Sequence, residues 1–144
     1  MPYVEVSTLM KGDPDRIYAT VRDMESYPKF MKDVVSVRIT DSGEGWTVTD
    51  WLTSIDGRKI KWTERDEFND GERVIQYRLL SGDLKKFEGF WRIEPEGETV
   101  RVTLTVDFEF GVPMLAPLLH PILKKKVKEN SEAMLEAIRG QIEN

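Results

Sequence analysis

The feature that most constrains the fold is a series of turn signals between residues 41 and 98. Each signal is a short cluster of Gly with Asp, Asn, Ser or Glu, and each separates segments rich in β-branched and aromatic residues. Such spacing is typical of consecutive β-hairpins. The clusters are Asp41–Gly43, Asp56–Gly57, Asn69–Gly71, Ser81–Asp83 and Glu96–Glu98. They predict an antiparallel meander.

Strict alternation marks the strands at both ends of this meander. In Val100–Phe110 every second residue is apolar and the residues between them are polar, so one face is buried and the other is wet. Tyr3–Met10 alternates in the same way and predicts a first strand. A further strand is expected at Val34–Thr40.

Helix signals flank the strands. Asp13 followed by Pro14 is an N-cap with proline at the first helical position, and this predicts a short helix to about Asp23. A second short helix is expected around Phe30 and Met31. Near the end of the chain, Pro121 opens a helix that runs to about Glu143. Its apolar stripe, which Asn130 and Ser131 interrupt, consists of Leu123, Val127, Met134, Ile138 and Ile142.

The predicted fold class is therefore α+β. Six or seven antiparallel strands cannot bury one face against two short helices alone, so the sheet must curl around the C-terminal helix. The 144 residues, 40% of them hydrophobic, suffice for one domain spanning 1–144. Between a curled sheet and its helix, bulky side chains either pack solidly or line a cavity, and the sequence leaves both outcomes open.

Composition excludes several classes of function. The chain has no cysteine and one histidine, His120, so disulfides, a cysteine nucleophile and a transition-metal site are not expected. The net charge of -5 argues against nucleic acid as a partner. The glycines form no phosphate-binding pattern, so no cofactor is expected. The chain shows no membrane-spanning run or signal peptide, and a cytoplasmic location is expected.

Several short motifs resemble one superfamily over nearly the whole chain. They are Tyr27–Met31, Asp56–Arg58, Trp62–Arg65, Gly82–Asp83, Phe87–Trp91, Asp107–Phe108, Gly111–Pro113 and Asn130–Ser131. Together they are similar to the START-related helix-grip superfamily, in its polyketide cyclase/aromatase and coenzyme Q-binding-like branch. The resemblance implies a START/Bet v 1-like fold, with two short helices after the first strand.

Members of this superfamily bind sterols, lipids, quinones, plant hormones or polyketides, and only some are enzymes. The resemblance thus implies a protein that binds or carries a hydrophobic small molecule, such as a lipid, an isoprenoid quinone or a polyketide-like aromatic, in an internal cavity. Ordinary core packing is the alternative role for the same residues. The expected pocket residues are Trp51, Trp62, Tyr77, Phe87, Trp91, Phe108, Phe110, Met114, Leu118, Val127 and Met134.

Arg65 is the candidate catalytic residue. Aromatase and cyclase relatives carry a pocket arginine in a Ser-Glu-Arg stretch, which Thr63–Arg65 resembles. The resemblance implies an alternative function, aldol-type ring closure of a polyketide with Arg65 anchoring a carbonyl or enolate. Under strict alternation, however, Arg65 faces away from Trp62, and only a bulge would bring them together. A surface arginine paired with an acid is the competing interpretation.

The other ionisable residues are not expected to take part in catalysis. Glu64 with Asp66, and Asp107 with Glu109, are pairs of carboxyl groups suited to acid-base chemistry, but solvent-exposed charges are the expectation. His120 is expected to lie in a loop without a catalytic role.

The segment from Met114 to Lys128 combines an apolar stretch with a run of lysines. This pattern predicts either transient contact with an anionic membrane or a simple entry to the helix with lysines on its wet face. Binding to a protein partner, as in ribosome-associated relatives, is a third class of function. The sequence does not determine the oligomeric state.

Overall fold

The computed structural model describes residues 3–55, 57–110 and 116–143, and of residues 116–120 it describes the backbone alone. Seven strands form one sheet in the order β1-β7-β6-β5-β4-β3-β2, and every pair of neighbours is antiparallel. The strands are β1 (Tyr3–Met10), β2 (Val34–Gly43), β3 (Trp46–Ile55), β4 (Arg58–Asn69), β5 (Val74–Gly82), β6 (Lys86–Glu96) and β7 (Thr99–Glu109).

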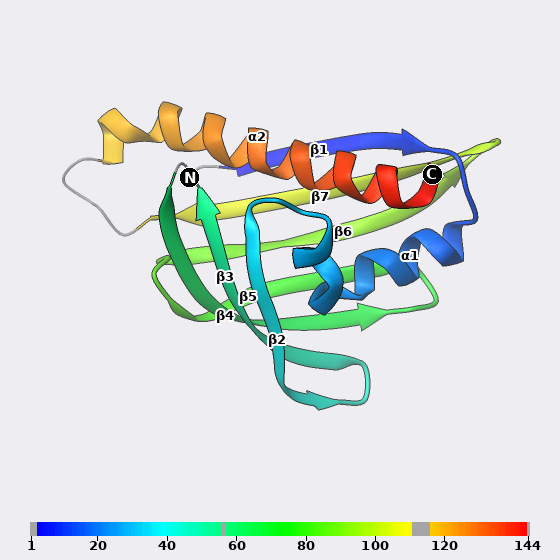
Figure 1. The fold of residues 1–144 in the computed structure, drawn as a ribbon, viewed down its shortest axis with the longest axis horizontal. Coiled ribbons are helices and arrows are strands. Elements are labelled where there is room, and N and C mark those ends of the chain that lie inside the picture. The colour runs from blue at the N-terminus through cyan, green and yellow to red at the C-terminus, as the bar shows by residue number, and fades with distance from the viewer. Residues whose placement is uncertain (1–2, 56, 111–115, 144) are drawn as a thin grey trace.

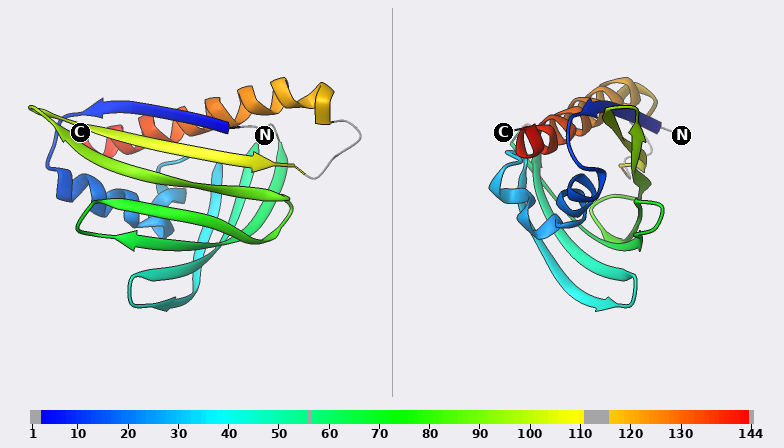
Figure 2. Two further views of the ribbon diagram at one scale, coloured as in Figure 1. Left: turned by 180° about the vertical axis from the view of Figure 1, so that it is seen from behind. Right: turned by 90° about the vertical axis from the view of Figure 1, so that its right-hand side faces the viewer.

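The sheet curls around one long helix, α2 (Ala116–Glu143), which runs along its concave side beside β1 (Figures 1 and 2). Bulges contribute to the curvature, because an extra residue bends its strand and increases its twist. Val35 and Thr40 are extra residues in β2 relative to β3, and Leu80 is an extra residue in β5 relative to β4. The predicted architecture of a curved sheet around a C-terminal helix is confirmed, but α2 begins at Ala116 and not at Pro121, so the backbone of His120 is helical and the expected loop at this position was wrong.

Two short helices connect β1 to β2, as expected. The first, α1 (Pro14–Arg22), begins where the sequence predicts, with the Asp13 side chain accepting a hydrogen bond from the Asp15 backbone N–H. The second, η1 (Met24–Lys29), is a 3-10 helix, so the expectation of a helix at Phe30 and Met31 was wrong. A 3-10 helix fits the sequence because a six-residue segment containing Pro28 cannot maintain a regular α-helical hydrogen-bond ladder.

The turn after β2 is also displaced from its prediction. The strand continues through Asp41–Gly43, and the chain reverses at Glu44 and Gly45, where Gly45 has a φ of 79°. Gly43 instead lies under the Trp46 indole, which a Cβ at this position would overlap. The glycine that makes the turn is therefore Gly45 and not Gly43.

The main core lies between α2 and the concave face of the sheet. On α2, residues spaced by three or four positions are buried, as an amphipathic helix requires: Val127, Ser131, Leu135, Ile138 and Ile142. They face the inward residues of β1, β6 and β7, including Val6, Ile93 and Val102. The C-terminal half of this layer is solid. Against the middle of α2 the packing opens into a cavity.

Candidate functional site

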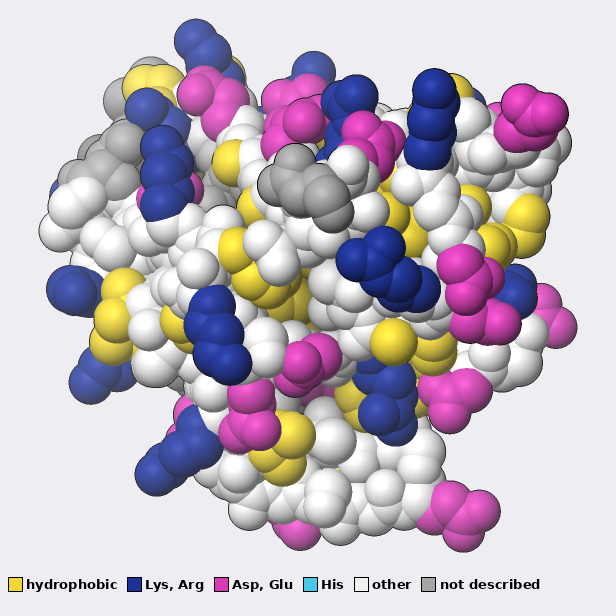
Figure 3. Space-filling view, turned by 45° about the vertical axis from the view of Figure 1, so that its right-hand side comes forward, with side chains coloured by type: hydrophobic (Ala, Val, Ile, Leu, Met, Phe, Trp, Pro, Cys, Tyr) yellow, Lys and Arg dark blue, Asp and Glu magenta, His cyan; other side chains and the backbone are white. Residues whose placement is uncertain are grey.

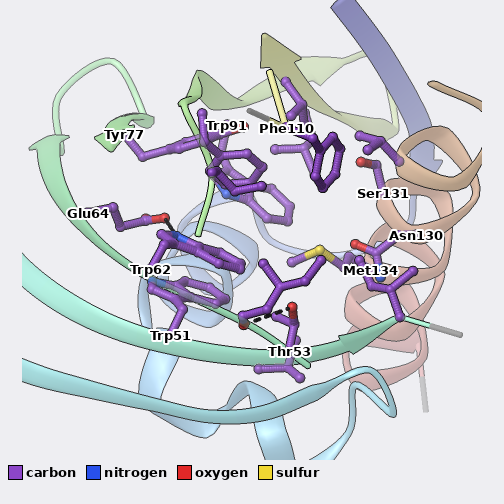
Figure 4. A pocket seen from close by; sticks show the side chains of 18 residues that line it. Trp51, Thr53, Trp62, Glu64, Tyr77, Trp91, Phe110, Asn130, Ser131 and Met134 are labelled. Atoms are coloured by element: carbon purple, nitrogen blue, oxygen red, sulfur yellow. Dashed lines mark hydrogen bonds between the residues drawn. The ribbon is translucent and has the colours of Figure 1, made fainter. Parts of the chain in front are cut away.

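A cavity lies between α2 and the aromatic inner face of the sheet (Figure 4). Strands β2 to β7 contribute to its floor and walls, and the middle of α2, from Val127 to Met134, covers it. Its lining is mostly apolar and aromatic, with four polar residues: Thr53, Glu64, Asn130 and Ser131. The other lining residues are Val34, Trp51, Ile55, Ile60, Trp62, Tyr77, Leu84, Phe87, Trp91, Leu104, Val106, Phe110, Val127 and Met134.

Stacked indoles dominate one wall. Trp51 on β3 and Trp62 on β4 are direct cross-strand partners, so their rings lie on the same face of the sheet. The ring centroids are 5.4 Å apart and the planes differ by 7°. Phe87 continues this wall, 4.9 Å from Trp62 and 5.3 Å from Tyr77 between ring centroids. The wall is aromatic throughout, with the Phe87 ring tilted by 55° to Trp62 and by 47° to Tyr77.

A pair of buried carboxyl groups lies beyond this wall. The strand β4 keeps unbroken register with β3, so Glu64 and Asp66 share the inward face with Trp62. Glu64 is 3% exposed and Asp66 is fully buried. Glu64 lines the end of the cavity farthest from α2 (Figure 4).

Hydrogen bonds connect these carboxyl groups to the indole stack. The Trp62 Nε1–H donates to Glu64 Oε1 over 2.8 Å. The Trp51 Nε1–H donates to Thr49 Oγ1 over 2.8 Å, and Thr49 Oγ1 donates to Asp66 Oδ2 over 2.7 Å. Because both indole N–H groups are used in this way, the carboxyl cluster fixes how the two rings face the cavity.

Burial sets the protonation of the pair. It raises the pKa of the Glu64 carboxyl well above 4.5, because desolvation penalises the charge, and the neighbouring Asp66 carboxylate adds to the effect. Desolvation also raises the pKa of Asp66, while hydrogen bonds from Glu64, Thr49 and Thr47 oppose the rise. Glu64 is thus the member of the pair that holds the proton, and Asp66 is the member that accepts hydrogen bonds.

The tyrosine hydroxyl near this end of the cavity is already used. Tyr77 Oη donates to the Thr105 carbonyl over 2.6 Å, and burial raises the pKa of Tyr77 so that it stays protonated. On the opposite wall, α2 contributes Asn130 and Ser131, and Asn130 Nδ2 donates to Asp33 Oδ2 over 3.3 Å. Polar groups therefore stand at both ends of an apolar space.

The cavity has a volume of about 70 Å³. This is below the ~300 to 1,000 Å³ typical of small-molecule pockets, and a cavity of about 150 Å³ is known to hold benzene. A ligand with a ring system therefore requires the walls to move apart.

Most of the expected pocket residues are brought together here. Trp51, Trp62, Tyr77, Phe87, Trp91, Phe110, Val127 and Met134 line the cavity. Phe108 instead lies in the solid core, 1% exposed, with its ring 5.4 Å from that of Phe110. Met114 and the side chain of Leu118 lie outside the described residues.

The structure places Arg65 on the face of β4 that strict alternation predicts, away from Trp62. The unbroken alternation of β4 turns Arg65 to the outer face, together with Glu67. Its guanidinium lies 4.4 Å from the Trp46 ring centroid, and its Nε donates to Glu67 Oε2 over 3.2 Å. The extra residue in this region, Leu80, is in β5, so it leaves the facing of β4 unchanged. Arg65 is therefore a surface residue in this fold.

Sequence reasoning missed Glu64, Asp66 and Ser131 as site residues. Alternation places both acids on the face of Trp62, but their charge favoured a solvent-exposed interpretation. On this strand, alternation predicts buried side chains at the two positions, whereas their charge predicts exposed ones. This conflict was the sequence signal that could have identified both acids. Ser131, interpreted as a break in the apolar stripe, is 2% exposed and lines the cavity.

A curved seven-stranded sheet that grips a C-terminal helix over an aromatic cavity defines a helix-grip fold of the START and Bet v 1-like type. The chain belongs to the family described as polyketide cyclase / dehydrase and lipid transport, whose model matches residues 10–135. The suspected membership of this superfamily is thereby confirmed.

Individual relatives are more distant. The ribosome association toxin RatA of Escherichia coli strain K12 is 28% identical over 111 residues, which cover 76% of this chain and 70% of RatA. Among solved structures, TTHA0849 from Thermus thermophilus superimposes with a TM-score of 0.92 and 29% identity, covering 96% of this chain and 95% of that one. The Zhui aromatase/cyclase from Streptomyces sp. R1128 superimposes with a TM-score of 0.87 and 24% identity, covering 96% and 92%.

Proposed function

We propose that this protein binds a planar hydrophobic small molecule between the Trp51–Trp62 wall and α2, and acts as its carrier. The observation that carries the proposal is the cavity itself, which is aromatic on one side and has few polar groups. Ligand pockets are typically apolar with a small number of placed polar groups. The family, described as including lipid transport, supports the same conclusion.

The ligand enters by displacing a wall. Leu84 lies in the β5–β6 loop and is a lining residue. The loop is held to β4 by two hydrogen bonds of 2.8 Å, from the Asp83 N–H to the Lys61 carbonyl and from the Lys61 N–H to Asp83 Oδ2. Breaking these bonds, together with the 2.9 Å bond from the Lys85 N–H to the Glu109 carbonyl, would release Leu84 and enlarge the space between the sheet and α2.

The test is to ask what stays bound to the purified protein and whether filling the cavity removes it. Native mass spectrometry and organic extraction should show an apolar molecule bound to the natural chain. Ser131→Phe projects a ring into the cavity and should abolish this binding. Glu132→Phe, at an exposed position next to it on α2, should retain it. An empty natural protein, or binding that is unchanged in folded Ser131→Phe, would contradict the proposal.

A second candidate is the polyketide aromatase/cyclase activity, which the family description favours. The polar group available inside the cavity is the Glu64 carboxyl, since Arg65 lies outside. Incubation with a poly-β-ketone should then show cyclisation that Glu64→Gln lowers and Arg65→Ala leaves unchanged. The opposite pattern would eliminate this role for Glu64.

The distribution of charge on the surface is relevant to the kind of partner the protein can bind. Basic and acidic side chains are interspersed over the face drawn in Figure 3, and no nucleic-acid partner is indicated. No helix within the described residues is both long enough and apolar enough to cross a membrane.

We also propose that the protein is cytoplasmic and makes transient contact with a membrane. Ile122 is 57% exposed and is followed by Lys124 and Lys125, so an apolar contact and positive charge adjoin at this end of α2. Binding to vesicles containing phosphatidylserine should weaken with salt and on neutralising Lys124, Lys125 and Lys126. Binding that ignores both changes would contradict this contact.

A further inference from the structure

Next to Glu64, which lines the inner end of the cavity, the buried Asp66 carboxyl group has an incomplete set of hydrogen bonds. Asp66 Oδ2 accepts from Thr49 over 2.7 Å and from Thr47 over 3.3 Å. Asp66 Oδ1 is buried and has no donor among these side chains. Glu64 lies two residues from Asp66 on the same inward face of β4, and the unpartnered Asp66 Oδ1 is the acceptor available to the proton that Glu64 retains. The proton of Glu64 is therefore already used.

What Glu64 offers to the cavity is an acceptor. A carbonyl oxygen of a carboxylic acid has two lone pairs, and the Trp62 indole takes one of them. The neighbouring donors are occupied, because the Trp51 N–H binds Thr49 and the Tyr77 hydroxyl binds the Thr105 carbonyl. A ligand that reaches this end meets an unsaturated acceptor and no free donor.

We propose that Glu64 selects ligands that carry a hydroxyl donor on a planar ring, a phenol or an enol, whose ring lies against Trp62. This inference rests on the proposed function, since it names the ligand class for the same cavity. A ring with only ether or ketone oxygens would place an acceptor against an acceptor. A carboxylate would fare worse, because none of the lining residues is a cation.

Two probes of similar shape separate these cases. In 2-naphthol the ring carries an O–H donor, and in 2-methoxynaphthalene the same oxygen can only accept. Isothermal titration calorimetry of the natural protein should give an affinity about tenfold higher for 2-naphthol, the effect expected of one buried hydrogen bond. This comparison requires no variant and does not depend on how a substitution folds.

Variants then locate the selectivity. Glu64→Leu removes the acceptor and should lower the preference to about one. Glu64→Gln should keep most of it, since the amide oxygen still accepts and the amide N–H can donate to Asp66. Glu67→Leu, on the outer face of the same strand, should keep all of it. Thermal melting checks that each variant is folded.

The outcomes distinguish the two proposals. If the natural protein binds both probes equally, Glu64 is not the selecting group, while the apolar cavity remains a binding site. If a folded Glu64→Leu variant keeps the preference, another residue supplies it and the inference is overturned. If neither probe binds the natural protein, this ligand class is wrong, and the extraction experiment above then decides separately whether the cavity binds any apolar molecule.

Discussion

At the scale of single residues, Gly89 on β6 shows how closely this strand approaches β7. Gly89 on β6 is paired with Tyr77 on β5, and the Tyr77 hydroxyl reaches the Thr105 carbonyl on β7. An aromatic side chain of this kind covers the gap that a glycine leaves in a strand. Tyr77 therefore occupies the space that the absent side chain of Gly89 leaves open.

We expect Gly89→Ala to destabilise the protein by roughly 3 kcal/mol, at the upper end of the cost of overpacking a core. Its Cβ would lie 2.0 Å from the Thr105 backbone oxygen, which has no flexible end that could yield. Urea unfolding measures the change. Gly140→Ala on α2 is the control, because its Cβ meets nothing within 4 Å, and it should be neutral or stabilise by up to about 1 kcal/mol. Equal effects of the two changes would contradict this account.

At the scale of elements, α2 combines two functions along its length. Its later part, with Leu135, Ile138 and Ile142 buried, fixes the helix to the sheet. Its middle part covers the cavity with Val127, Ser131 and Met134. Movement of this part of the helix, like release of Leu84, would enlarge the small cavity for a ring-bearing ligand.

Ile138→Ala should therefore cost about 2–5 kcal/mol of unfolding free energy, as for large-to-small changes in a core. Ile138 is fully buried, whereas Ile122 on the same helix is 57% exposed. Ile122→Ala should change stability by less than about 0.5 kcal/mol. Chemical denaturation of both variants checks the contrast, and a similar loss for both would mean that the two parts of the helix do not differ in this way.

At the scale of the whole molecule, the sequence predicts the fold far better than the site. Turn clusters and alternation set the strands, and the Asp13–Pro14 cap sets α1, since these signals act locally. The inward position of Glu64 follows from alternation, but its stability inside depends on Thr49, Trp62 and Asp66 being brought together by the finished sheet. The cavity volume depends on how all side chains pack, and no local pattern encodes it.

The Glu64–Asp66 pair also makes stability depend on pH. The unfolded chain releases the Glu64 proton near the ordinary pKa of 4.5, whereas the folded protein retains it because burial raises this pKa. Folding thus takes up a proton above about pH 4.5, and raising the pH opposes folding. The contribution is fully present below that pH and is lost as the pH rises toward the folded pKa. For one proton the slope is at most about 1.4 kcal/mol per pH unit.

Glu64→Gln should remove most of this slope, so its unfolding free energy should fall less than that of the natural protein between about pH 5 and 8. Tyr27 and Tyr77, which face the pair, have raised pKa values and stay protonated throughout this range. Glu67→Gln, an exposed acid on the same strand, should retain the natural slope. Denaturant unfolding at several pH values gives the three profiles, and parallel lines for Glu64→Gln and the natural protein would show that Glu64 is not the group that couples folding to protons.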